Sequence, residues 1–214
     1  MFAESLDGRG IGFGYRRDRP VLDGLDIHLP AGSLTALCGR SGRGKSTLLY
    51  LLAGLLTPWR GQVRLGERDL HAGSDATRSA YRAAHFGFIF QDVVLDARRS
   101  VLDAVLEPCL YAGLDKAVHT GRALDLMARL GVDLDPDVLP GQISGGQAQR
   151  IGVCRALLLG PRIVFAGEHT GNLDDDSTEA VVTALLGAAT GGCTVLVATH
   201  DDRIVRRATA RVEL

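Results

Sequence analysis

Apolar and polar positions are arranged in two different ways along this chain. Three segments alternate or are rich in β-formers, with Gly and Pro between them, which predicts short strands of an antiparallel patch; they are residues 11–15, 25–29 and 62–65. Four other segments are short and almost continuously apolar, and they are residues 33–38, 86–90, 163–166 and 194–198. The first enters a glycine-rich loop and the others end in polar residues, so we expect buried parallel strands whose carboxyl ends carry a site.

The middle of the chain has a helical pattern instead. Ser100 with Asp103 resembles a helix start, and apolar residues follow it at positions 101, 102, 105 and 106. Residues 116–130 repeat this character. We therefore predict a single α/β domain over residues 1–214, with a catalytic core at about 1–91 and 159–214 and an inserted helical lobe at about 92–158.

Length and composition agree with one globular domain. The chain has 214 residues, of which 46% are hydrophobic, so it can bury a sizeable core and is not expected to be disordered. The formal net charge of -1 gives no electrostatic footprint for nucleic acid, so no such partner is expected. The arginine pairs at 16–17 and 206–207 are interpreted as solvated surface, with lipid head groups or an acidic partner as the alternative.

No secretory or membrane-crossing segment is expected from the pattern. The start lacks a basic region followed by an apolar one. The longest apolar stretch, residues 48–56, is shorter than the ~20 residues that span a bilayer and follows a glycine-rich loop, which favours a buried helix. The four cysteines form no C-x-x-C pair, so we expect buried free thiols rather than a disulfide or metal site.

A phosphate-binding loop of the form G-x-x-x-x-G-K-S is the clearest chemical signal. Its glycines allow the backbone to wrap around phosphate oxygens, and the helix that follows adds its positive end. Lys45 is expected to reach the β- and γ-phosphates, and Ser46 to offer its hydroxyl to Mg²⁺. Kinases, GTPases and many ATPases share this loop. Its candidate nucleotide-binding residues are Gly39, Arg40, Ser41, Gly42, Arg43, Gly44, Lys45, Ser46 and Thr47.

A second glycine-rich helix start follows about a hundred residues later. One phosphate loop is enough to hold one nucleotide, so a second anion-binding helix start has to serve another. The simplest source of that nucleotide is a second copy of the chain. The pattern therefore favours an ATP-driven dimer over an ordinary kinase or GTPase. The residues of this second start are Ser144, Gly145, Gly146 and Gln147.

Taken together and in order, the motifs of this chain resemble the nucleotide-binding subunit of an ATP-binding cassette (ABC) transporter. Alone, Tyr15 could be a core aromatic, Gln91 a strand cap and His200 a structural histidine. Their order favours the site interpretation. The matching residues are Tyr15 for the adenine-stacking aromatic, Gln91 for the Q-loop, Ile143-Ser144-Gly145-Gly146-Gln147 for the signature, Ile163 to Glu168 for Walker B, Asn172-Leu173-Asp174 for the D-loop and His200 for the switch histidine.

The resemblance implies a P-loop NTPase (RecA-like) core, ATP and Mg²⁺ as cofactors, and ATP hydrolysis in a head-to-tail dimer. It also implies the residue roles. Glu168 would polarise the attacking water, His200 would contact the γ-phosphate, and Gln91 would contact the metal or water. Ser144 with the amides of Gly145 and Gly146 would close over the partner's nucleotide, and Asp174 would lie at the dimer seam.

One position departs from the family pattern. Walker B normally ends in Asp-Glu followed by Pro, whereas this chain has Gly167, Glu168 and His169. The missing aspartate normally holds the Mg²⁺ shell. Losing an outer-shell metal partner typically costs roughly 10–100-fold in affinity or activity. We therefore expect nucleotide binding to remain, Mg²⁺ dependence to weaken and hydrolysis to be slow.

The strings Thr-Gly-Asn-Leu-Asp and Ala-Thr-His-Asp look like the lipoprotein-release and macrolide-export branch. This branch implies a separate membrane permease as partner and a cytoplasmic location on the inner face of the membrane. Val93, Val94 and Leu95 could form part of a docking groove for that permease or be buried in the core.

Three alternatives stay open: a division-associated cassette, a soluble cassette of translation or DNA repair, and a degenerate cassette that acts as a nucleotide-gated scaffold. The second class usually has two cassettes or a long coiled coil. The sequence also leaves open the substrate, the direction of transport, and whether the dimer pairs two identical or two different chains.

Overall fold

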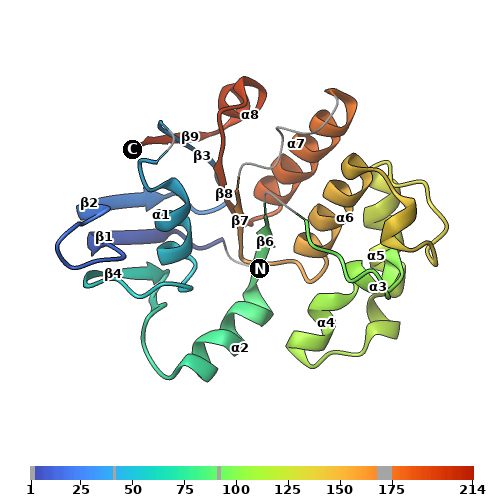
Figure 1. Cartoon of the computed structure of the whole chain (residues 1–214), viewed down its shortest axis with the longest axis horizontal. Coiled ribbons are helices and arrows are strands. Elements are labelled where there is room, and N and C mark those ends of the chain that lie inside the picture. Colours follow the sequence, from blue (N-terminus) through green and yellow to red (C-terminus); the bar gives the residue numbers. More distant parts are fainter. Residues whose placement is uncertain (1–2, 41, 91–92, 168–174) are drawn as a thin grey trace.

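The two kinds of apolar segment form two separate sheets in the computed structural model (Figure 1), which describes residues 3–40, 42–90, 93–167 and 175–214. The smaller sheet is antiparallel, in the order β2-β1-β4-β5, and its strands are β1 (Leu6–Phe13), β2 (Leu22–Leu29), β4 (Arg60–Leu65) and β5 (Arg68–Asp69). The larger sheet is parallel throughout, in the order β6-β7-β8-β3-β9. Its strands are β3 (Leu34–Cys38), β6 (Phe86–Ile89), β7 (Ile163–Ala166), β8 (Thr194–Ala198) and β9 (Ala210–Glu213).

The parallel sheet is covered on both faces, which explains why its strands are so continuously apolar. Along β7, Val164 and Ala166 join one core cluster, whereas Ile163 and Phe165 join the other. The first cluster includes apolar residues of the helices after β6, and the second includes those of the helix after β3 and of the antiparallel sheet. This arrangement confirms the predicted fold class of a parallel P-loop core with an antiparallel patch.

The stretch between β6 and β7 is helical, as expected. Its helices gather on the side of the molecule opposite the antiparallel sheet (Figure 1). The predicted start at Ser100 is confirmed, because the Ser100 hydroxyl accepts the backbone N–H of Asp103 at 3.2 Å. The apolar pattern continues past Val105, but Pro108 opens a new helix in which its missing N–H is tolerated. The elements are α3 (Val101–Val105), α4 (Glu107–Ala112), α5 (Lys116–Arg129), the 3₁₀ turn η1 (Pro140–Gln142) and α6 (Gly145–Leu157).

The remaining helices lie beside strands of the parallel sheet. The apolar stretch 48–56 is only partly helical, since α1 ends at Leu52 and Gly54 follows with a φ of 65°. This left-handed backbone is a usual helix terminator that favours glycine. Helices were not predicted at residues 75–85, 175–190 or 202–207, where the structure has the other three of this group. The helices of this group are α1 (Lys45–Leu52), α2 (Asp75–His85), α7 (Asp175–Thr190) and α8 (Asp202–Arg207).

Strand limits agree with the sequence pattern in the parallel sheet and less well in the antiparallel one. β7 and β8 coincide with the predicted segments. The predicted strand at 11–15 was wrong in its limits, because β1 begins at Leu6 and ends at Phe13. The chain turns at Gly14, where a Cβ atom would lie 2.4 Å from the carbonyl oxygen of Arg19. Tyr15 is therefore released from the sheet, which matters for the site below.

The cysteines are buried and free, as expected from their spacing. Burial raises the pKa of the Cys154 and Cys193 thiols to about 12, so both stay protonated and unreactive near neutral pH. Within the described part of the chain, no helix is long and apolar enough to cross a membrane.

Candidate functional site

The glycine-rich loop connects β3, in the centre of the parallel sheet, to the start of α1. Its backbone has a positive φ at each of its three glycines, with values of 145° at Gly39, 79° at Gly42 and 96° at Gly44. At Gly44 space is also short, because a Cβ atom would lie 2.8 Å from a methyl carbon of Val21. The loop therefore turns into α1 at Gly44 and presents backbone amides at the positive end of this helix. Ser41 lies outside the described residues.

Lys45 is the first residue of α1, and its side chain is buried beneath the loop. Its ammonium group donates to the carbonyl oxygens of Gly39 at 2.7 Å and Arg40 at 3.4 Å. It also lies 3.1 Å from the Nε2 atom of His200. An ammonium group can only donate, so this nitrogen of His200 is the acceptor. The geometry leaves the cation at the centre of the loop, where a phosphate group would meet it.

His200 reaches this place from a distant part of the sequence. It follows β8, which pairs in parallel with β3 so that Leu37 lies opposite Ala198. Both strands therefore end at the same edge of the sheet, and Lys45 and His200 meet although 155 positions separate them. The next residue, Asp201, caps α8 by accepting the backbone N–H of Arg203 at 2.9 Å. The switch histidine predicted from the sequence therefore has a defined position beside the phosphate loop.

A cavity of 430 Å³ opens next to the loop at the ends of β6, β7 and β8. Gly167 lines it from the end of β7, where its N–H donates to the carbonyl oxygen of Ile89 at 2.9 Å. Gly167 therefore lines the same cavity as Ser46. A residue that helps to hold a metal at the Ser46 hydroxyl should lie at this position, but glycine offers no side chain for that purpose. The cavity lining includes Tyr15, Val21, Gly42, Gly44, Lys45, Ser46, Thr47, Phe88, Phe90 and Gly167.

Tyr15 presents an exposed aromatic face at the mouth of this cavity, with 68% of its surface accessible. The ring packs edge-on against Phe13, at 5.4 Å between centroids, and Phe13 in turn packs against Trp59. Its hydroxyl lies 3.3 Å from the Thr47 hydroxyl, at the start of α1. A ring held in this way on one side and open on the other can stack on a planar base.

The second glycine-rich helix start begins α6. The Ser144 hydroxyl accepts the Gln147 backbone N–H at 3.2 Å, and the Gln147 side-chain oxygen accepts the Ser144 N–H at 2.8 Å. These two bonds form a capping box. Ser144 and Gly145 are exposed, and neither is among the residues that line the cavity at the phosphate loop. The chain thus presents two separate helix starts, one beside its own cavity and one facing outward.

Gln91, Glu168 and Asp174 lie outside the described residues, as does Ser41. Among the described residues no group of three or more His, Cys, Asp or Glu could hold a metal ion. The loop and Lys45 fit the phosphates of a nucleotide, whereas the described part of the cavity offers Mg²⁺ the Ser46 hydroxyl and no carboxylate.

Several residues that line the cavity were not predicted to do so, and Val21 and Phe88 are two of them. Val21 precedes β2 and donates its backbone N–H to the carbonyl oxygen of Phe13 at 2.7 Å, and its side chain lies next to Gly44 of the loop. Phe88 packs face to face with Phe165 at 5.8 Å and forms the floor. Both are ordinary apolar residues in the sequence, and only the folded sheet brings them to the site.

The family model described as ABC transporter matches residues 22–171. The chain is 39% identical over 188 residues to lipoprotein-releasing system ATP-binding protein LolD 1 of Rhodospirillum rubrum, covering 87% of this chain and 83% of that protein. It is 38% identical over 194 residues to the macrolide export ATP-binding/permease protein MacB of Photorhabdus laumondii, covering 91% of this chain. It spans only 30% of the length of that MacB protein.

The fold is also that of solved cassettes. The chain superposes on the dimeric structure of MJ0796, a bacterial ABC transporter cassette, with a TM-score of 0.87, 26% identity, and coverage of 98% of this chain and 94% of the other. A post-hydrolysis dimer of MJ0796 with ADP and Pi gives a TM-score of 0.88 at 26% identity over the same shares of both chains. The family model, the sequence relatives and the shared fold agree, and the chain belongs to the ABC transporter family as an ATP-binding cassette.

Proposed function

We propose that the chain binds ATP and Mg²⁺ and hydrolyses ATP in a head-to-tail dimer, and that this cycle drives a membrane permease. The observation that carries the proposal is the separation of the two helix starts. Lys45 lies under one of them beside the cavity, whereas Ser144 caps the other and faces outward. A chain with two such starts and one cavity can complete two nucleotide sites by pairing with a second cassette.

Within one chain, Tyr15 stacks on the base and the residues of the phosphate loop hold the phosphates. Lys45 compensates γ-phosphate charge, and Ser46 holds Mg²⁺. Mg²⁺ supplies further compensation of phosphate charge when bound. His200 contacts the γ-phosphate from the end of β8. Glu168 and Gln91 act on the attacking water as inferred from the sequence.

In the dimer, Ser144 with the amides of Gly145 and Gly146 closes over the partner's nucleotide, with Gln147 holding the cap. Asp174 lies at the seam. Two findings support this arrangement: the exposed position of Ser144 and the dimeric structure of the MJ0796 cassette. The second cassette is either an identical chain or a different one.

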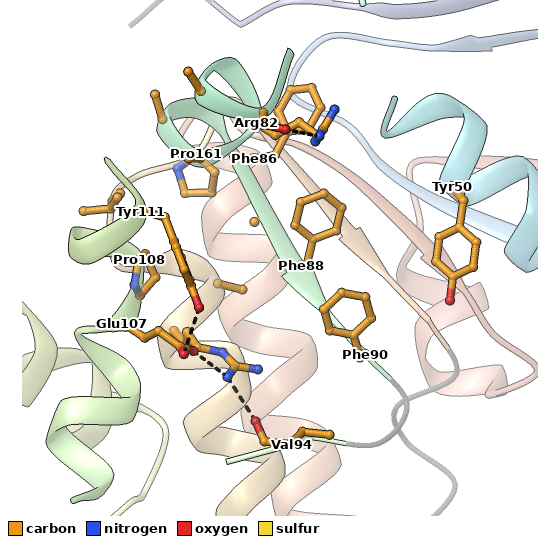
Figure 2. A pocket seen from close by; sticks show the side chains of 18 residues that line it. Tyr50, Arg82, Phe86, Phe88, Phe90, Val94, Glu107, Pro108, Tyr111 and Pro161 are labelled. Carbon is orange, nitrogen blue, oxygen red and sulfur yellow. Dashed lines mark hydrogen bonds and ion pairs between the residues drawn. The ribbon is translucent and has the colours of Figure 1, made fainter. Parts of the chain in front are cut away.

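The permease docks in a large groove beside the phosphate site. An apolar cytoplasmic segment of the permease occupies this groove. The groove has a volume of 1040 Å³ and lies between α2, α4, α6 and the end of β6 (Figure 2). Exposed apolar side chains line it, among them Phe90, Val94 and Tyr111. The name of MacB, an ATP-binding/permease protein of which this chain matches 30%, supports a permease as occupant.

Of the three apolar residues 93–95, one lines the groove and the other two pack against other parts of the chain. Val94 is exposed and lines the groove, whereas Leu95 packs against the core and Val93 packs against Gly152. Of the two interpretations that the sequence allowed, docking thus applies to Val94 alone. We propose that the helical stretch 92–158 is the lobe that couples the cassette to the permease at the inner face of the membrane. We place the chain as a whole in the lipoprotein-release and macrolide-export branch of the family.

A second candidate function follows from Gly167. The cavity wall beside Ser46 has no side chain at this position. A chain that binds ATP but hydrolyses it slowly would act as a nucleotide-gated scaffold, or as the impaired half of a heterodimer.

The direct test of the proposed function is Mg²⁺-dependent ATP hydrolysis by the purified chain over a range of protein concentrations. We expect a rate that rises faster than linearly with protein, because two chains complete each site, and that vanishes in a Glu168→Gln variant. ATP binding without hydrolysis above that variant would instead support the scaffold or a partner cassette. Absence of ATP binding would reject both functions.

Lys45→Met should lower the affinity for a fluorescent ATP analogue by roughly 10–100-fold, since hydrogen bonds to charged groups contribute about 1.5–3 kcal/mol. Fluorescence anisotropy measures this directly. The chain has one other lysine, Lys116, which forms an ion pair with Asp103 at 2.6 Å in the helical stretch. Lys116→Met is therefore the matched control, and equal affinities in the two variants would contradict the site.

Gly167→Asp should increase hydrolysis about 10–100-fold and make it depend more steeply on Mg²⁺ concentration, because it restores a metal partner beside Ser46. Steady-state rates over a Mg²⁺ titration measure both effects. Gly121→Asp on α5 is the control, since a Cβ atom there meets nothing within 4 Å. Equal rates in Gly167→Asp and the unmodified chain would refute this account.

Val94→Glu should abolish binding to permease-containing membranes while ATP affinity stays within about twofold, because it places a carboxylate in an apolar contact. Flotation with membrane vesicles stripped of peripheral proteins measures the binding. Val118→Glu on α5 is the matched control, as the two valines are 80% and 76% exposed. Protease treatment of the vesicles should remove binding, which separates a protein partner from lipid. Loss of ATP affinity in Val94→Glu would contradict a separate docking surface.

A further inference from the structure

A second hollow, with a volume of 800 Å³, opens beside the cavity at the phosphate loop. Its lining shares Tyr15, Val21 and Gly42 with the lining of that cavity, so the two spaces adjoin at the exposed ring of Tyr15. The site described above makes no use of this hollow. Three arginines line it, whereas none lines the cavity, and they are Arg16, Arg19 and Arg43.

A tight turn between β1 and β2 carries two of these arginines. The Arg19 N–H donates to the Arg16 carbonyl oxygen at 3.1 Å, and the two residues form an isolated antiparallel bridge. The turn packs on Gly14, where a Cβ atom would lie 2.4 Å from the Arg19 carbonyl oxygen and 2.8 Å from the Trp59 ring. The sequence left this turn open between solvated surface and contact with lipid head groups or an acidic partner. Its backbone is held in place, so Arg19 starts from a defined position close to Tyr15.

Arg19 and Arg43 form no ion pair within the part of the chain that the structure describes, whereas most other described arginines have a carboxylate partner. Two aspartates also line the hollow, but both have other partners. Asp23 forms an ion pair with Arg60, and Asp26 accepts a backbone N–H at 2.6 Å. The two guanidinium groups are therefore available to an anion that enters the hollow.

Positive charge is concentrated in this part of the chain. Residues 16–45 contain six Lys or Arg and three Asp, which is an excess of three positive charges, whereas the whole chain has a formal net charge of -1. An anion that approaches the hollow thus meets a positive local field on a molecule that is slightly negative overall. Such fields raise association rates by about 10–1,000-fold at low ionic strength.

We propose that the hollow is a capture site for the triphosphate of ATP, in which Arg19 and Arg43 attract the anion before its base stacks on Tyr15 and its phosphates enter the loop. The proposal rests on the proposed function, which supplies the nucleotide. Neither arginine lines the cavity, so their side chains act on association rather than on the final complex. Capture by charge also favours ligands with more phosphates, because the attraction grows with the charge of the ligand.

Stopped-flow mixing of the purified full chain with N-methylanthraniloyl-ATP and Mg²⁺ tests this at ionic strengths of about 10 and 150 mM, where the Debye length is about 30 and 8 Å. In the unmodified chain we expect the association rate constant to fall roughly fivefold or more between the two conditions. In Arg19→Gln the rate at low ionic strength should fall about threefold, while the dissociation rate constant stays within about twofold. The double variant Arg19→Gln/Arg43→Gln should associate more slowly still and depend less on salt.

A matched control removes the same two charges elsewhere. Arg98→Gln/Arg129→Gln changes two exposed arginines of the helical stretch, which pair with Asp96 at 3.3 Å and Asp125 at 2.9 Å. This variant should associate as the unmodified chain does, because a distant change in net charge leaves the local field in place.

Two further measurements separate capture by charge from a structural role. Arg19→Lys should keep the unmodified association rate, since steering requires the charge and not the planar guanidinium. The corresponding ADP analogue should lose less than the ATP analogue in the glutamine variants, because it carries less charge.

The inference is overturned if the association rate of the unmodified chain does not depend on ionic strength, or if the control variant loses as much as the double variant in the hollow. Arg19→Lys as slow as Arg19→Gln would also overturn it, because that result indicates a specific contact or a structural role. These outcomes leave the proposed function intact. Absence of analogue binding by the unmodified chain would instead reject nucleotide binding itself.

Discussion

The parallel pairing of β3 with β8 is the constraint on which the site depends. It brings the ends of two strands to one edge of the sheet, so the ammonium of Lys45 and the imidazole of His200 lie 3.1 Å apart despite their distance along the chain. β7 pairs with β8 on its other side and adds Gly167 to the same edge. Because each strand is packed on both faces, a register shift would exchange the two cores, and the edge is therefore held in place by the apolar interior.

The sequence predicted most of this edge and little of its surroundings. β7 and β8 were located residue by residue, because continuous burial leaves a run of apolar letters that ends at polar ones. The phosphate loop and the capped start at Ser144 were equally visible, since each requires fixed residue types at fixed spacing. β9 and α2 were missed: the strand has half-buried and exposed positions only, and the helix buries no residue completely. The groove was only partly foreseen, since its shape depends on which of three similar apolar residues packs against Gly152.

In the proposed function, the departure from the family pattern at Gly167 concerns metal binding rather than nucleotide binding. The interactions that hold phosphate, namely the loop amides, the α1 dipole and Lys45, do not involve this position. A carboxylate at the end of β7 would lie in the same cavity as the Ser46 hydroxyl and would attract a divalent cation there. Without it, the described cavity lining has an ammonium group and hydroxyl groups but no carboxylate. In the proposed function, affinity for the triphosphate and orientation of its metal therefore depend on different residues of this chain.

Glycine has three different physical meanings in this cassette, and the sequence does not distinguish them. At Gly42 and Gly44 it permits a left-handed backbone, so the requirement is conformational. At Gly152 the backbone is helical and the requirement is space for Val93. Gly167 matters for neither conformation nor space, but because glycine leaves the site without a side chain at this position. Only the contacts around each residue assign these meanings. The close packing of Val93 against Gly152 was therefore invisible in a pattern that identified the family itself without difficulty.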